Sequence, residues 1–257
     1  MSEKEHRRHR SSFDYGYETK TPLGKRHSHH RSFSEKRARS PSNSFNDDSY
    51  ASIVKKRKIS PHPLLDGYQL IGDSLLLRFA EQVLFERCIY DNGMRYLGLC
   101  VSGQTIEELK ERVENKFSPV GEKIILLIGT NNILQGASAD DMRDSLVELL
   151  DLLDERAKRI VILTLPPIPK LENDGRFWYK FNSYNGFIKT LNIKRENVTV
   201  KDISQLFLEE GYCNMDYFER WYDRLQRRPD LIHLNRAGLL KIKTHLLKNN
   251  VLSEEES

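Results

Sequence analysis

Four short segments of this sequence carry side chains whose types and spacing suit acyl transfer. Three follow apolar runs and one precedes the last helical pattern: Gly72-Asp73-Ser74, Ser102-Gly103, Gly129-Thr130-Asn131 and Asp230-Leu231-Ile232-His233. Nucleophilic catalysis needs a serine hydroxyl, an imidazole that takes up its proton, and a carboxylate that orients the imidazole. The sequence therefore contains the residue types for attack on an ester, provided that the fold brings these segments together.

Ser74 is placed where a strand should end and a helix should begin. Residues 68–71 form a short apolar run typical of a buried strand, and residues 75–87 have apolar side chains at helical spacing. A serine between them lies at the positive end of the helix, on the edge of a parallel sheet where ligands bind. The alternative interpretation is that Asp73 and Ser74 only cap the helix.

Gly103 and Asn131 are candidate donors to the oxyanion that such an attack creates. A glycine brings its backbone N–H close to a ligand because no side chain intervenes, and an Asn amide is a ready donor. The sequence equally permits an ordinary turn at Gly103 and a helix-capping or turn role for Asn131.

His233 is the candidate base. After residue 62 the chain has only two histidines, and His245 lies within a helical pattern where a packing or surface role is expected. Asp230, three residues before His233, can hold one ring nitrogen and leave the other to accept the serine proton. A capped turn before the last helix is the alternative.

These segments must be positioned by alternating strands and helices. Strands are predicted at residues 68–71, 94–99, 123–128, 159–165 and 198–200, and helices at 75–87, 106–113, 140–156, 181–191 and 235–249. Such alternation predicts an α/β protein, a three-layer α/β/α sandwich around a parallel, flavodoxin-like sheet of about five strands.

The four segments, in this order, resemble the SGNH, or GDSL-type, hydrolase superfamily over residues 64–250. The resemblance implies an acyl-enzyme mechanism on an ester or acetyl ester, with Ser74, Asp230 and His233 catalytic. It also implies an oxyanion hole made by Ser74, Gly103 and Asn131, and it requires neither a metal nor an organic cofactor. The sequence departs from the commonest form of the superfamily where Asn132 replaces an Asp.

Residues 1–62 form a basic head. Within residues 1–60, 15 Lys and Arg stand against 7 Asp and Glu, a balance of +8 in a chain whose total is +4, so the rest carries −4. Without apolar periodicity the head is predicted to be disordered. Its cluster Lys55, Lys56, Arg57 and Lys58 suits nuclear import, weak nucleic-acid binding or a solvated, phosphorylated linker. A domain at 63–252 and an acidic tail at 253–257 follow.

A binding module is the second hypothesis. The superfamily includes non-catalytic members such as the Oskar-type RNA-binding domain, to which this chain is similar in its setting and basic head. Residues 217–228 combine aromatic side chains with Arg220, Arg224, Arg227 and Arg228, a composition suited to single-stranded RNA. The alternative is an amphipathic helix with its aromatic residues packed inward. At this level the retained serine, aspartate and histidine favour the hydrolase.

The cellular compartment is inferred from the absence of targeting signals. The first 30 residues lack the apolar core of a signal peptide, no run is long enough to span a membrane, and the three cysteines are unpatterned. We therefore expect an intracellular protein of the nucleus or cytoplasm. Residues 168–181, with Phe177, Trp178 and Tyr179, are predicted to form an aromatic lid over the site, but the substrate itself is not indicated.

Overall fold

The computed structural model describes residues 61–223 and 228–248. Most of the predicted head, with Lys55, Lys56, Arg57 and Lys58, lies outside the described residues, as do Arg224, Arg227 and the acidic tail. The predictions about those segments therefore stay predictions. Among the described helices, none has the length and apolar character that crossing a bilayer requires.

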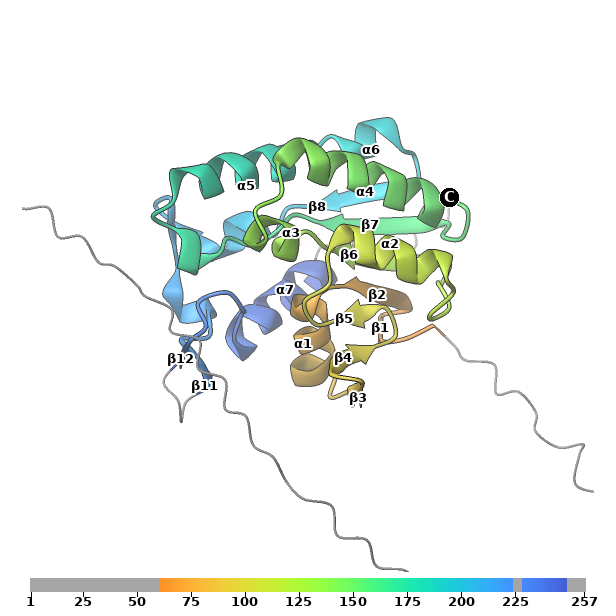
Figure 1. Ribbon diagram of the computed structural model, residues 1–257, viewed down its shortest axis with the longest axis horizontal. Helices are drawn as coiled ribbons and strands as arrows, with labels where there is room; N and C mark the ends of the chain where they lie inside the picture. Colours follow the sequence, from red (N-terminus) through yellow and green to blue (C-terminus); the bar gives the residue numbers. More distant parts are fainter. Residues whose placement is uncertain (1–60, 224–227, 249–257) are drawn as a thin grey trace, which may run out of the picture. The chain divides into compact units, whose positions relative to one another are not determined.

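The core of the domain is a sheet of five parallel strands with antiparallel additions (Figure 1). The parallel strands lie in the order β5 (Cys100–Val101), β2 (Tyr68–Gly72), β6 (Lys123–Leu127), β7 (Arg159–Leu163) and β8 (Val198–Lys201). The antiparallel strands are β1 (Leu64–Leu65), β3 (Ile89–Asp91) and β4 (Met94–Leu97). Since the first parallel strand in the chain lies second in the sheet, the order is flavodoxin-like. The predicted fold class is confirmed.

The single strand predicted at residues 94–99 is wrong in detail. The chain turns through Gly98 and Leu99, so β4 runs antiparallel to β5, and only β5 joins the parallel set. Gly98 has a φ of +56°, in the left-handed region that glycine enters easily. The sequence does not indicate this reversal, because the residue that ends β4 and both residues of β5 are buried and apolar.

Helices cover both faces of the sheet (Figure 1). On one face α1 (Ser74–Val83) packs against α7 (Arg236–Lys248), and on the other α4 (Ala139–Asp154) lies between α2 (Ile106–Glu114) and α5 (Gly175–Ile188). The shorter elements are α3 (Thr130–Leu134), α6 (Leu191–Lys194), η1 (Pro169–Leu171), η2 (Ser204–Phe207), η3 (Met215–Tyr217) and strands β9 (Leu208–Glu209), β10 (Tyr212–Cys213), β11 (Trp221–Asp223) and β12 (Arg228–Pro229). The result is the predicted three-layer sandwich.

Two aromatic segments differ from the predictions. The described residues of 217–228 do not form an amphipathic helix, because β11 pairs with β12 in an antiparallel ladder; Phe218 is buried, but Trp221 is 46% exposed. In the segment predicted to form an aromatic lid, α5 begins at Gly175, earlier than the helix start expected at residue 181, and makes residues 177–179 helical; the lid stays a prediction. Phe177 is buried there and packs on Phe181, so it belongs to the core. The capping side chain of Asp174, which accepts from the Arg176 N–H, starts this helix.

Gly72 allows the carboxyl end of β2 to lie close to β6. It lies opposite Leu127 in the parallel ladder, and a Cβ at position 72 would come closer than 3.0 Å to the Leu127 carbonyl oxygen. That oxygen belongs to the backbone of a central strand and cannot move aside. Only glycine therefore fits at the point where the strand gives way to Ser74.

We predict that Gly72→Ala lowers the free energy of unfolding by about 3 kcal/mol, the upper end of the usual cost of overpacking. Urea unfolding followed by circular dichroism measures the change. The matched control is Gly186→Ala, at an exposed position of α5 where an added Cβ meets open space. That control should be neutral or stabilising by up to about 1 kcal/mol, because glycine weakens a helix. Equal stability of the two variants would contradict the packing argument.

Candidate active site

Ser74, His233 and Asp230 form a continuous hydrogen-bonded chain. The Ser74 Oγ lies 3.0 Å from Nε2 of His233, and Nδ1 of the same ring lies 2.9 Å and 2.8 Å from the two carboxylate oxygens of Asp230. With Nδ1 donating to Asp230, Nε2 is the acceptor of the serine proton. The three residues, predicted from two segments far apart in the chain, are thus placed as a nucleophile, a base and an orienting carboxylate require.

The turn that carries Asp230 and His233 is held by its own backbone and by the segment before it. Oδ1 of Asp230 accepts the N–H groups of Ile232 at 3.0 Å and His233 at 2.9 Å. Across the turn, the N–H of Glu219 donates to the His233 carbonyl at 2.8 Å, and the N–H of Leu231 donates to the Glu219 carbonyl at 3.0 Å. The imidazole is therefore positioned by paired backbone and not by a free loop.

Asp230 is kept ionised although it is buried. Burial on its own raises the pKa of this carboxyl, but the hydrogen bond and charge of the His233 side chain and the backbone N–H donors outweigh it, so the pKa lies below the usual value. The Arg78 guanidinium adds a cation 3.4 Å from Oδ2. Arg78 follows Ser74 by four residues on α1, so both side chains project from the same face of the helix.

The candidate oxyanion donors are linked to one another through Gln104. Gly103 has a φ of +82° and is exposed, and the next residue, Gln104, is buried. The Gln104 side-chain amide donates to the carbonyls of Gly72 and, at 2.9 Å, Leu99. The Gln104 carbonyl in turn accepts a bond of 2.9 Å from Nδ2 of Asn131, whose second amide hydrogen is then available to a ligand. This network joins the loops after β5 and β6 to the end of β2.

Asn132 has a structural role. Its Oδ1 accepts the N–H of Ile106 at 3.0 Å, and its Nδ2 donates to the Glu107 carboxylate at 2.8 Å. Both partners lie in the first turn of α2, whose N–H groups need acceptors from outside the helix. The departure from the commonest superfamily sequence at this position therefore supports a helix start and leaves the candidate site intact.

Asp73 is a fully buried carboxyl directly before the candidate nucleophile. Oδ1 accepts the N–H of Leu75 at 2.9 Å and caps α1, while Oδ2 has no hydrogen-bond partner among the described residues. Desolvation raises the pKa of Asp73 to about 6, although the Leu75 N–H, the charge of His233 and the neighbouring Thr130 counteract it in part. The negative charge of Asp73 is therefore unfavourable in the folded protein.

Among the residues predicted to bind nucleic acid, Arg220 is the one whose side chain lies within the described part of the chain. Arg220 is exposed and its carbonyl accepts the Asp230 N–H at 3.2 Å, so its backbone supports the turn that carries the candidate base. Arg228 lies in β12, but its side chain is not described, and the remaining predicted cations lie outside the described residues. Conversely, sequence reasoning missed Arg78 and Gln104. The helical spacing from Ser74 could have indicated Arg78, whereas no sequence signal marks Gln104.

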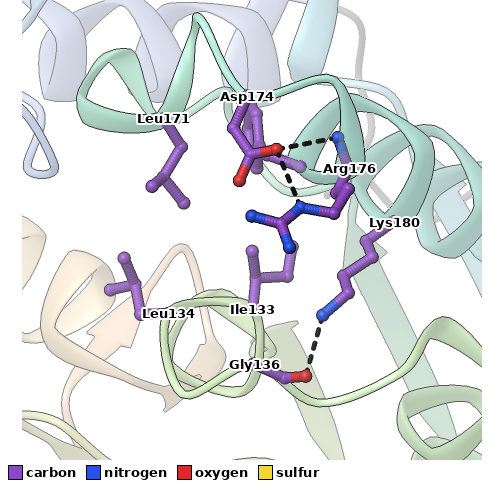
Figure 2. Close-up of a pocket in the computed structure, with 8 residues that line it drawn as sticks. Ile133, Leu134, Gly136, Leu171, Asp174, Arg176 and Lys180 are labelled. Atoms are coloured by element: carbon purple, nitrogen blue, oxygen red, sulfur yellow. Dashed lines mark hydrogen bonds and ion pairs between the residues drawn. The ribbon is translucent and has the colours of Figure 1, made fainter. Parts of the chain in front are cut away.

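A cavity of about 350 Å³ opens between α3 and the start of α5 (Figure 2). Figure 2 shows Leu134 and Leu171 facing across it and Arg176 and Lys180 at its side. The Lys170 N–H, in the same η1 turn as Leu171, donates to the Leu231 carbonyl at 2.9 Å, which connects the cavity wall to the Asp230–His233 turn. In residues 61–223 and 228–248, no cluster of three or more His, Cys, Asp or Glu side chains is arranged to hold a metal ion.

The strand order and the hydrogen-bonded serine, histidine and aspartate at the carboxyl edge define a domain of the SGNH-like class. Solved structures with this fold include the OSK domain of Drosophila Oskar, with a TM-score of 0.65 and 22% identity over 79% of this chain and 98% of that one. They also include a putative acylhydrolase from Bacteroides fragilis, with a TM-score of 0.56 and 17% identity over 76% and 92% of the two chains.

Within that class, this chain belongs to the OSK domain family, whose model matches residues 47–238. The maternal effect protein oskar of Drosophila virilis is 30% identical over 159 residues, which are 61% of this chain. The chain spans about a quarter of the length of that relative, 26%. The resemblance to the SGNH superfamily therefore holds for the fold, and the family is the OSK domain.

We predict that Asp73 makes the domain less stable as the pH rises from about 4 to 6. Because its folded-state pKa of about 6 exceeds the ordinary 3.8, its favourable contribution is complete below pH 3.8 and is lost as the pH passes the folded value. A shift of about two units corresponds to roughly 3 kcal/mol. Asp73→Asn should remove this loss, so its stability relative to wild type should increase between pH 4 and 7 in urea titrations. A constant difference across that range would contradict the pKa assignment.

Proposed function

We propose that this OSK-family domain is a nucleic-acid-binding module that takes single-stranded RNA on the face formed by α7 and its neighbours. The observation that carries the proposal is the distribution of charge between the two faces of the sheet. Helix α7 contains four Lys and Arg residues and no Asp or Glu, whereas α4, on the opposite face, contains six Asp and Glu and a single Arg (Figure 1).

This separation of charge allows a domain with a net negative charge to attract phosphate. Residues beyond the head carry −4 in total, which by itself repels phosphate. Much of that negative charge lies on α4, while Arg236 and Lys248 are exposed on α7 and Lys243 is half-buried between them. A phosphate backbone that follows α7 meets cations along the helix and stays on the opposite side of the sheet from the acidic helix. Release of counterions then drives association.

Aromatic side chains beside α7 favour a single strand over a duplex. The Lys241 ammonium lies 3.9 Å from the ring centroid of the half-buried Tyr217, so a cation and an aromatic ring lie together beside the middle of the helix. Unpaired bases stack on such rings, whereas paired bases are not available to them. Membership of the OSK family and the similarity to the maternal effect protein oskar also support the binding module over the hydrolase.

A serine hydrolase is the second candidate, because the Ser74–His233–Asp230 chain is complete. Ser74 Oγ would attack an ester carbonyl while Nε2 of His233 takes the proton, and the same imidazole would return it to the departing alcohol. Water activated by His233 would then release the acid from the acyl-enzyme. The N–H groups of Ser74 and Gly103 and the Asn131 amide are the proposed donors to the oxyanion. The cavity beside η1 suits the apolar part of a small ester or acetyl ester.

For RNA binding, we predict that the double variant Lys243→Gln, Lys248→Gln weakens binding of a single-stranded oligoribonucleotide by the full-length chain. The slope of log K against log salt should fall by about 0.7 for each phosphate contact that is lost. Fluorescence anisotropy across a salt series measures both quantities.

The matched control is Lys194→Gln, an exposed lysine on α6. It should leave affinity and slope unchanged. A further variant with glutamine at positions 55–58 separates the contribution of the head. If that variant loses all binding and the α7 variant loses none, the head is the RNA arm and α7 is not.

For catalysis, we predict that a fluorophosphonate probe labels wild-type protein at Ser74 and that Ser74→Ala abolishes the labelling. The Ser102→Ala variant, which removes an exposed serine near the site, should still be labelled at Ser74. With an acetyl ester substrate, His233→Ala should lower turnover by several orders of magnitude and Asn131→Ala by about 10²–10³-fold. A folded wild-type chain that resists the probe would exclude the hydrolase and leave the RNA proposal untouched.

A further inference from the structure

Phe85 is an aromatic residue with an exposed side chain and an unusual backbone conformation. It follows the last residues of α1, and 73% of its side chain is exposed. Its φ of +59° lies in the left-handed region, which at the end of a helix is normally occupied by glycine or asparagine. Exposed apolar area and a left-handed backbone are both unfavourable, and together they mark a candidate for function.

The ring of Phe85 is held from one side by α7. The guanidinium carbon of Arg236 lies 5.8 Å from the ring centroid, in a cation–π arrangement. The contact favours this orientation of the ring, and the high exposure shows that much of the ring surface still faces solvent. Arg87, two residues further along, is also exposed. The aromatic surface therefore lies beside Arg236 at the start of the acid-free helix, and Arg87 follows it in the chain after one exposed acid, Glu86.

We infer that Phe85 is a stacking site for an unpaired nucleobase, with Arg236 and Arg87 contacting the flanking phosphates. The inference rests on the proposed RNA function and adds a defined base site to it. A base has a flat π surface that covers an exposed ring, and its backbone supplies the negative charge that the two arginines complement. A flat apolar partner without charge would cover the ring but leave the positive charge of the two arginines unmatched.

A second exposed aromatic residue provides a matched comparison. Tyr179 is 74% exposed, nearly the same as Phe85, but it belongs to α5, and that helix covers the opposite face of the sheet from α7 (Figure 1). Its backbone is helical and requires no left-handed conformation. If exposure alone produced base stacking, both rings would contribute; if the α7 face is required, only Phe85 will.

The test measures binding of the full-length chain to a single-stranded oligo(U) and to an RNA duplex of equal length. Phe85→Leu should weaken oligo(U) binding about 5- to 150-fold, the range for loss of one stacked base, and leave duplex binding within twofold. Phe85→Tyr should restore binding, and Tyr179→Leu should leave it unchanged. In Phe85→Trp, oligo(U) should quench fluorescence beyond the change seen in wild type. Thermal unfolding checks that each variant is folded.

The other outcomes each overturn the assignment in a distinguishable way. If Phe85→Leu binds oligo(U) like wild type while Lys243→Gln, Lys248→Gln does not, the RNA function stands and the base site fails. An equal loss for oligo(U) and duplex shows that the ring acts through the fold. If wild type binds neither RNA, the proposed function fails with it. If wild type sediments as a dimer that Phe85→Leu dissociates, the ring instead covers a second copy of the chain.

Discussion

The close approach of β2 to its two neighbours at its carboxyl end is the constraint on which the site depends. The Gly72 N–H donates to the Leu99 carbonyl on one side, and the Asp73 N–H donates to the Leu127 carbonyl on the other. The strand therefore stays paired up to the residue before Ser74, and α1 begins at once. Because neighbouring strands end at the same edge, the loops that follow them deliver the other candidate donors to the same place.

One segment serves both proposed functions. The Asp230–His233 turn is fixed by backbone pairing with residues 217–220, and α7 starts three residues after His233. The turn that orients the imidazole thus also sets the direction of the basic helix. Any ligand that follows α7 toward its first turn approaches the edge that carries Ser74. The candidate serine–histidine–aspartate site and the proposed surface for nucleic acid are compatible on this fold because they share supports without sharing contact residues.

Predictions from the sequence were wrong where they relied on local patterns of residues, but the structure depends on contacts between distant segments. Residues 217–228 have helical spacing of aromatic residues, yet Phe218 pairs with Leu234 in an isolated bridge, and the hairpin of β11 and β12 follows. The helix predicted from residue 181 begins at Gly175, because the Asp174 side chain caps it ahead of the apolar pattern. The net charge of the domain was also a poor guide, because a single sum does not show that α4 and α7 have net charges of opposite sign on opposite faces of the sheet.

The sequence by itself determined the alternation of strands and helices, the flavodoxin-like class and the trio Ser74, Asp230 and His233, because periodicity and short motifs are properties of neighbouring residues. Only the tertiary structure decided that Arg78 lies against Asp230, that Gln104 joins three loops, and that the Phe85 ring is oriented by Arg236. Those contacts join residues far apart in the chain or depend on burial. They exist only after the sheet has set the distances between its strand ends and helices.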